Sequence, residues 1–213
     1  DTAQLHLVPN GVDPDAYVPL RSHQIAPPTP LREPAPTLIY LGRFSYEPNA
    51  EAAEILLREI FPAVKATINN SRLLLVGCDP TNTMQRLAQS QPNVIVTGRV
   101  DDIKPYLAAA TVMVVPLRKG SGTRLKLLEA FAANCPVVST AKGAEGLVVE
   151  DGKHLLIRDT PAAMVDAIQV LFQRPQQRQS LAQMAYQRFL SHYAWPAVNR
   201  HIQSALNHLL PPQ

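Results

Sequence analysis

The chain has 213 residues, of which 46% are hydrophobic and 17% charged, with a net charge of +3. This balance is typical of a folded globular protein and excludes a disordered tail or a coiled coil. The basic residues are scattered rather than massed in runs, and no window holds the roughly 18 consecutive apolar residues that span a membrane, so neither a nucleic-acid surface nor a transmembrane helix is indicated.

The predicted elements alternate along the chain. A proline-rich stretch at residues 25–37 predicts an extended connector. Five apolar runs then predict strands buried on both faces, at residues 37–41, 72–76, 93–96, 111–115 and 136–139. Helical spacing marks residues 49–64 and 123–133, with Asn49 and Thr123 as caps. A short strand at 154–157 precedes helices at 161–172, 175–192 and 195–210.

This alternation predicts an α/β fold with a Rossmann-like, doubly wound parallel sheet. In such sheets, ligands bind at the carboxyl ends of the strands, where the strand order reverses. The candidate residues are therefore those that directly follow the strands.

The loop after the fourth predicted strand resembles a phosphate site. Gly120 and Gly122 let backbone N–H groups approach a ligand, and the helix that begins near Thr123 presents unpaired donors to an anion. The spacing is neither that of a P-loop nor that of a dinucleotide-binding loop. The alternative is an ordinary glycine-rich turn with a threonine cap.

Three charged side chains follow on this helix. Lys126 and Glu129 lie three residues apart and share one face, so we expect Lys126 to bind a diphosphate and Glu129 to accept hydrogen bonds from ribose hydroxyls. Arg124 lies close enough to reach the same phosphates. The alternative for Lys126 and Glu129 is a surface salt bridge that needs no ligand.

Two further strand ends carry arginine. Gly42 and Arg43 follow the first strand, where the guanidinium could bind a phosphate with two parallel hydrogen bonds. Arg99 and Val100 follow the third strand and suit contacts to a base. The alternatives are a commonplace strand end and a turn in which Asp101 caps the next helix. No histidine stands out as a catalytic base.

Together these motifs resemble the retaining GT-B glycosyltransferases of group 1, which include glycogen-synthase-, sucrose-synthase- and mannosyltransferase-like enzymes. The resemblance is carried by VPNGVD at 8–13, LGR at 41–43, LVG at 75–77, VTGRV at 96–100, LLEA at 127–130, CPVV at 135–138, AEGL at 144–147 and YAW at 193–195. It covers nearly the whole chain and identifies it with the C-terminal, donor-binding half of that fold.

The resemblance implies a hexosyltransferase that binds a nucleotide-diphosphate sugar without metal or other cofactor and retains the anomeric configuration. Arg43 and Lys126 would be catalytic and would bind the phosphates with Gly122, Thr123 and Arg124. Glu129 would bind the ribose, Arg99 and Val100 the base, and Gly120 and Ser121 the sugar. Two family positions depart from the pattern: Ser121 stands where a second glutamate is usual, and residues 45–48 lack the usual phosphate-binding lysine.

The expected organisation is a linker and connector at 1–36, a nucleotide-sugar-binding domain at 37–192 and a C-terminal helix at 193–213. We expect the acceptor to be bound by a preceding domain absent from this chain, through which peripheral membrane association would also occur. The chain alone would bind donor with little or no transfer. Two cysteines make no disulfide framework and favour a cytoplasmic location. A sugar-nucleotide epimerase half and a non-catalytic nucleotide-binding module are the alternatives.

Overall fold

The computed structural model describes residues 8–122 and 124–209. Its centre is one sheet of six parallel strands in the order β3-β2-β1-β4-β5-β6. The strands are β1 (Thr37–Leu41), β2 (Arg72–Val76), β3 (Val94–Val96), β4 (Val112–Val115), β5 (Val137–Ser139) and β6 (Leu156–Ile157). The six predicted strand positions are confirmed, and the order reverses between β1 and β4, as in a doubly wound Rossmann-like sheet.

The burial of the strands follows their place in this order. Every residue of the central strands β1 and β4 is buried, which confirms the prediction that they are covered on both faces. The prediction was wrong for β3, whose three residues are only half-buried. β3 lies at the edge of the sheet, where one neighbouring strand is missing and cover is thinner.

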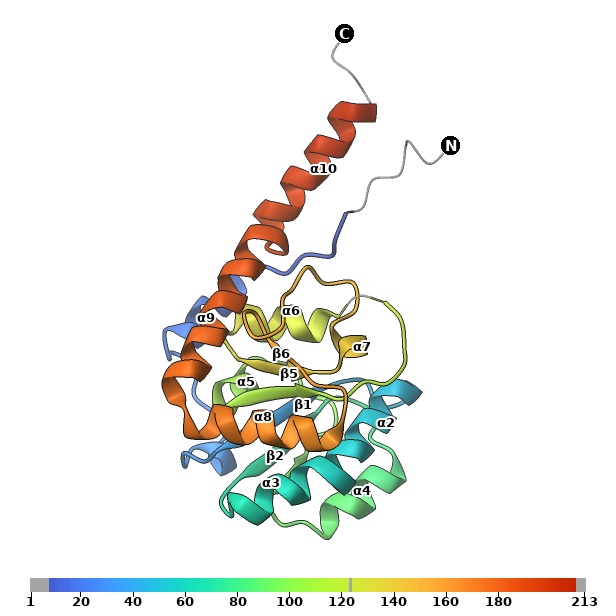
Figure 1. The fold of residues 1–213 in the computed structure, drawn as a ribbon, viewed down its shortest axis with the longest axis vertical. Helices are drawn as coiled ribbons and strands as arrows, with labels where there is room; N and C mark the ends of the chain where they lie inside the picture. Colours follow the sequence, from blue (N-terminus) through green and yellow to red (C-terminus); the bar gives the residue numbers. More distant parts are fainter. Residues whose placement is uncertain (1–7, 123, 210–213) are drawn as a thin grey trace.

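The helices form layers on both sides of the sheet. Residues 47–67 form one continuous helical stretch made of α2 (Glu47–Ile55), the π-helical segment η4 (Leu56–Ile60) and α3 (Phe61–Thr67). These helices, α4 (Asn82–Gln89) and α8 (Pro161–Gln173) contact one another on one face. α5 (Lys104–Ala109) and α6 (Leu125–Ala132) cover the other face (Figure 1), as right-handed crossovers on the two sides of a switch point require.

Asn49 does not cap its helix. The prediction was wrong because the helix begins two residues earlier, at Glu47, with a proline in its first turn. Asn49 therefore lies inside the first turn, and its side chain is free to bond elsewhere. Thr123, the other predicted cap, lies outside the described residues; α6 itself begins at Leu125 and has no side-chain cap at Arg124.

The segment before β1 packs on the domain more closely than an extended connector would. It contains η2 (Asp15–Tyr17), α1 (Val18–Arg21) and η3 (Thr29–Leu31). Tyr17, Leu20 and Leu31 are buried in the hydrophobic core. The prolines shape this segment into short turns, because proline is tolerated in the first turn of a helix.

The start of the described chain contacts the base of the last helix. α7 (Ala141–Ala144) and α9 (Pro175–His192) lead to α10 (Trp195–Leu209), which extends away from the body of the domain (Figure 1). The backbone N–H of Val12 donates to Tyr193 at 2.9 Å, and that of Trp195 donates to Val12 at 3.2 Å. The start of the chain thus pairs with the base of α10. The domain limits at residues 36 and 192 stay a prediction.

Candidate functional site

A cleft of about 630 Å³ lies at the carboxyl ends of the strands, at the point where the strand order reverses. Its walls are the residues that follow β1, β2 and β3 together with the first turns of α6. Six of its lining side chains are polar or were predicted site residues: Arg43, Asn49, Arg99, Val100, Lys126 and Glu129. The fold therefore brings together five predicted residues from three separate segments: Arg43 and Lys126 for phosphate, Glu129 for ribose, and Arg99 and Val100 for the base.

The loops after β1 and β2 touch at the floor of this cleft. Gly42 N–H donates to Val76 at 3.1 Å, and Phe44 N–H donates to Cys78 at 2.9 Å. Gly77 has φ of 146°, and a Cβ on it would lie 1.8 Å from the carbonyl oxygen of Gly42. Only glycine fits there, since any side chain would push the two loops apart.

Arg43 is held at the rim. Its side chain is 72% exposed, and its Nε lies 3.1 Å from both a carboxylate oxygen of Asp79 and the hydroxyl of Ser45. The hydrogen bonds from Arg43 and Ser45 hold the pKa of Asp79 below its usual value. The remaining guanidinium nitrogens can therefore meet an anion in the cleft while Nε stays anchored.

Lys126 lies deeper and has neutral partners. Its ammonium donates to the hydroxyl of Tyr40 at 2.9 Å and to the side-chain oxygen of Asn49 at 2.8 Å. Burial, with a further contribution from the charge of Arg124, lowers its pKa to about 7, although Glu129 acts in the opposite direction. A lysine poised between its two protonation states gains a proton when an anion approaches.

Glu129 lies one helical turn further along α6. Burial raises its pKa to about 6, while Lys126 and Lys104 oppose the shift. At neutral pH it is ionised and offers carboxylate oxygens to hydroxyl donors. The predicted pair on α6 is thus partly buried in the cleft wall, and its two groups are not joined as a surface salt bridge in the structure.

Arg124 points away from the cleft. Its side chain is 6% exposed, and its guanidinium donates to the carbonyls of Gly120 at 3.2 Å, Ser121 at 3.4 Å and Lys142 at 2.9 Å. It joins the 120–122 loop to α7. In this arrangement its hydrogen bonds hold the backbone of the 120–122 loop. Its predicted contact with phosphate stays a prediction.

The loop at 118–122 borders α2 rather than lining the cleft. Gly120 and Gly122 have φ of 104° and 90°, which glycine adopts without strain. Lys119 pairs with Glu47 and with Glu51, so it fixes the loop to the start of α2. The sugar and phosphate roles of residues 120–122 stay predictions, and the phosphate role of Thr123 falls outside the described residues.

The loop after β3 brings Arg99 and Val100 to the cleft, as the base-binding prediction requires. The turn alternative is partly right as well. The backbone N–H of Lys104 donates to the side chain of Asp102 at 2.9 Å, so the residue that closes the turn is Asp102 and not Asp101. A turn and a base contact are compatible here, because the turn only fixes the backbone.

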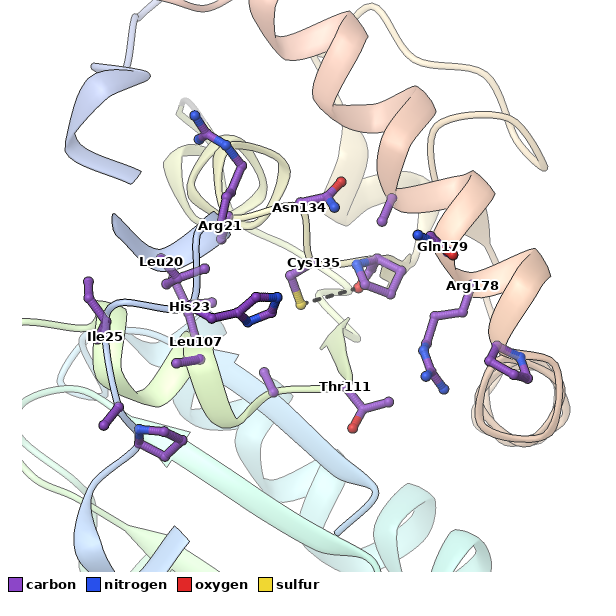
Figure 2. A pocket seen from close by; sticks show the side chains of 18 residues that line it. Leu20, Arg21, His23, Ile25, Leu107, Thr111, Asn134, Cys135, Arg178 and Gln179 are labelled. Carbon is purple, nitrogen blue, oxygen red and sulfur yellow. Dashed lines mark hydrogen bonds between the residues drawn. The ribbon is translucent and has the colours of Figure 1, made fainter. Parts of the chain in front are cut away.

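A second, larger pocket lies at the opposite end of the strands, beside their amino ends (Figure 2). It has a volume of about 720 Å³, and its walls include Thr111 and Pro136, which directly precede β4 and β5. His23, Cys135 and Arg178 face it (Figure 2). Ligands of parallel sheets bind at the carboxyl ends of strands, and this pocket lies at the amino ends, so size alone does not make it the candidate site.

Comparison with known proteins decides the family. The sequence profile named glycosyl transferases group 1 matches residues 35–174, which include all six strands of the sheet. The chain belongs to the group 1 glycosyl transferases. This confirms the resemblance drawn from the motifs, and the fold is that of the GT-B donor half.

Individual proteins and solved structures are similar to this chain. A phosphatidyl-myo-inositol mannosyltransferase of Mycobacterium leprae is 30% identical over 77% of this chain and 43% of its own length. A sucrose-phosphate synthase of Thermosynechococcus elongatus superimposes with a TM-score of 0.72 at 25% identity, covering 95% of this chain and 52% of the other. HepE of Anabaena, solved with UDP-glucose, gives 0.73 at 16% identity, covering 93% and 56%. The chain spans about half the length of these relatives.

Within this family fold, three polar side chains were not predicted as site residues: Asn49 lines the cleft, Tyr40 contacts Lys126 and Asp79 contacts Arg43. The sequence predicts Tyr40 to be part of an apolar strand and Asn49 to be a helix cap. Neither pattern predicts a contact with Lys126. Asp79 lies two residues after the strand-end Gly77, and Arg43 directly follows the strand-end Gly42, so closeness to a strand end was the one signal in the sequence.

The described residues form neither a metal-ligand cluster nor a membrane-spanning helix. Across residues 8–122 and 124–209, no three His, Cys, Asp or Glu side chains gather as metal ligands would. Over the same part of the chain, no helix is long and apolar enough to cross a bilayer.

Proposed function

We propose that this chain is the donor-binding part of a retaining, metal-independent hexosyltransferase, and that a nucleotide-diphosphate sugar binds in the cleft at the carboxyl ends of the strands. The observation that carries the proposal is the placement of Arg43 and Lys126 on one cleft, with Glu129 one turn beyond Lys126 on α6. Two cations next to a carboxylate suit a diphosphate joined to a ribose.

The roles follow from position. Arg43 at the rim and Lys126 in the wall would bind the two phosphates, Glu129 would accept hydrogen bonds from the ribose hydroxyls, and Arg99 and Val100 would flank the base. HepE of Anabaena, which has this fold, was solved with UDP-glucose. The Mycobacterium leprae relative is named as a mannosyltransferase.

The proposed catalysis is electrostatic. When the bond between sugar and diphosphate breaks, negative charge grows on the departing nucleoside diphosphate. Fixed cations and backbone N–H groups stabilise that charge more than they stabilise the intact donor, which is the condition for acceleration. Arg43 and Lys126 would supply this stabilisation in place of a metal ion.

The acceptor would be bound by a domain that precedes this chain in a longer protein, which would also provide any attachment to a membrane. The chain spans about half of its relatives, which supports this division. The chain alone would then bind the donor and transfer little or nothing. A cytoplasmic location completes the proposal and rests on the two free cysteines.

The test is calorimetric binding of UDP, GDP, ADP and their sugars to the chain, with ligand-dependent thermal stabilisation as a second readout. Arg43→Met should weaken binding of the best nucleoside diphosphate by about tenfold or more, because a charge-assisted hydrogen bond contributes about 1.5–3 kcal/mol. The matched control is Arg86→Met, at an exposed arginine on α4.

Two results would contradict the proposal. One is equal nucleotide affinity in Arg43→Met and Arg86→Met. The other is a nucleoside diphosphate that binds while its sugars gain no affinity, which would favour a plain nucleotide-binding module. An epimerised product formed from a nucleotide sugar without acceptor would indicate the epimerase alternative.

A further inference from the structure

Lys126 is joined to two side chains that come from distant parts of the chain. Tyr40 lies in β1 and Asn49 in the first turn of α2, 86 and 77 residues away in sequence. We call Tyr40, Asn49 and Lys126 the Lys126 network. Tyr40 is fully buried, so this hydroxyl sits in the core with its hydrogen bonds directed to the other two members.

Asn49 is the centre of the network. Its side-chain oxygen accepts from the hydroxyl of Tyr40 at 2.8 Å and from Lys126 at 2.8 Å. Its amide nitrogen donates to the backbone carbonyl of Arg43 at 2.9 Å. One side chain therefore connects the ammonium of Lys126 to the loop that carries Arg43.

We propose that Tyr40 and Asn49 are positioning residues that hold the ammonium of Lys126 beside the Arg43 loop, so that both cations meet the diphosphate of a nucleotide sugar. The inference rests on the proposed function and deepens it. It explains how Lys126 on α6 can supply a phosphate-binding ammonium, although residues 45–48, which follow β1, contain no lysine.

The geometry leaves room for a ligand on the ammonium. A protonated lysine has three N–H donors, and Tyr40 and Asn49 accept two of them. The third is available to a phosphate oxygen in the cleft that Lys126 lines. The Tyr40 ring, whose centroid lies 4.1 Å from Nζ, stabilises the charged form through a cation–π contact.

The network works against the charges and burial around it. Burial lowers the pKa of Lys126 to about 7, the neighbouring Arg124, directly before α6, adds to the shift, and Glu129 on α6 opposes it. Tyr40 from β1 and Asn49 from α2 contribute only neutral oxygens, and Arg43 shares the cleft. The protonation state of Lys126 should thus report directly on the two acceptors.

The first experiment titrates Lys126 in the ligand-free chain. Lysine labelled with ¹³C at Cε is followed by NMR from pH 5 to 11, and the Lys126 signal is the one lost in Lys126→Met. The wild-type midpoint should lie near 7. Asn49→Asp places a carboxylate on Nζ and should raise the midpoint by about one unit or more, whereas Tyr40→Phe removes an acceptor and should lower it.

Two further variants guard the comparison. Asn49→Ala lacks both the amide oxygen and the amide nitrogen and should lower the midpoint. This variant keeps the test decisive if Asn49→Asp folds poorly. Tyr186→Phe removes a hydroxyl from α9, keeps the ring that contacts Arg21, and should leave the midpoint unchanged. A purely structural role for Tyr40 would change stability without moving this midpoint.

The second experiment measures UDP affinity of the same variants between pH 6 and 9. Wild-type affinity should fall up to about tenfold per pH unit above the Lys126 midpoint, and the fall should shift with the midpoint in each variant. A common midpoint near the ordinary lysine value in all variants would overturn the inference, even if UDP still binds. Failure of the wild type to bind any nucleoside diphosphate at any pH would instead reject the proposed function.

Discussion

Burial shifts the two ionisable groups on α6 toward their neutral forms from opposite directions. The pKa of Glu129 is raised to about 6 and that of Lys126 is lowered to about 7. A diphosphate requires the charged lysine and ribose hydroxyls prefer the charged carboxylate. Nucleotide affinity should therefore be highest between these two values and fall on both sides.

The acid side of this profile belongs to Glu129. Below pH 6 its carboxyl gains a proton and loses acceptor capacity, so affinity for UDP should fall as the pH drops from 6 to 5. Glu129→Gln should bind more weakly at neutral pH and lose the acid limb, whereas Glu59→Gln, an exposed control, should keep it. Calorimetry across this range checks both, and an acid limb that survives in Glu129→Gln would contradict the role.

The same shift has a consequence for stability. The folded pKa of Glu129 lies above its unfolded value, so the group stabilises the fold below about pH 4.5 and this contribution is lost as the pH rises through 6. At pH 7, the free energy of unfolding of Glu129→Gln should therefore exceed that of the parent chain by up to about 2 kcal/mol. Urea denaturation at pH 4 and 7 measures this, and equal effects at the two pH values would refute it.

At the scale of elements, the cleft depends on the close approach of the loops after β1 and β2. Gly77→Ala places a Cβ against the carbonyl of Gly42 and should cost more than about 3 kcal/mol, besides weakening nucleotide binding. Gly152→Ala is a matched control, because Gly152 also has positive φ, of 75°, but open space around it. It should cost only about 1–2 kcal/mol.

Denaturation of these two alanine variants separates the effects. Both variants place alanine at a positive φ, so a larger loss in Gly77→Ala reports chiefly the contact with Gly42. If Gly77→Ala is no less stable than Gly152→Ala, the loops tolerate separation and do not form a fixed floor.

At the scale of the whole molecule, the segment before β1 is attached through Arg21. Its guanidinium donates to the carbonyl of Ala132 at the end of α6 at 2.8 Å and lies 4.5 Å from the ring centroid of Tyr186 on α9. Arg21→Met should lower the unfolding free energy by about 1–3 kcal/mol. Arg21 lines the pocket at the amino ends of the strands, so UDP affinity at low temperature should not change.

Arg32→Met is the comparison for this variant, since Arg32 is exposed in the same segment. It should leave the unfolding free energy within about 0.5 kcal/mol of the parent. Equal stabilities of the two variants would mean that the segment is carried along by the domain rather than attached to it through Arg21.

The sequence by itself determined the strands, most helices and the place of the cleft. These follow from local periodicity, since apolar runs mark buried strands and glycines mark the loops after them. The three-residue spacing of Lys126 and Glu129 likewise placed both on one face of a helix. The positions of the six strands needed no knowledge of their distant neighbours, and for β3 only the extent of burial was wrong.

The tertiary structure alone decided which partners the charged groups have. Asn49 looked like a cap and binds Lys126, Arg124, whose phosphate role stays a prediction, donates to the carbonyl of Lys142, and Asp79 anchors Arg43. These contacts join residues far apart in the chain. Local patterns encode whether a side chain is buried, but the choice of its partner depends on which remote segments pack against it.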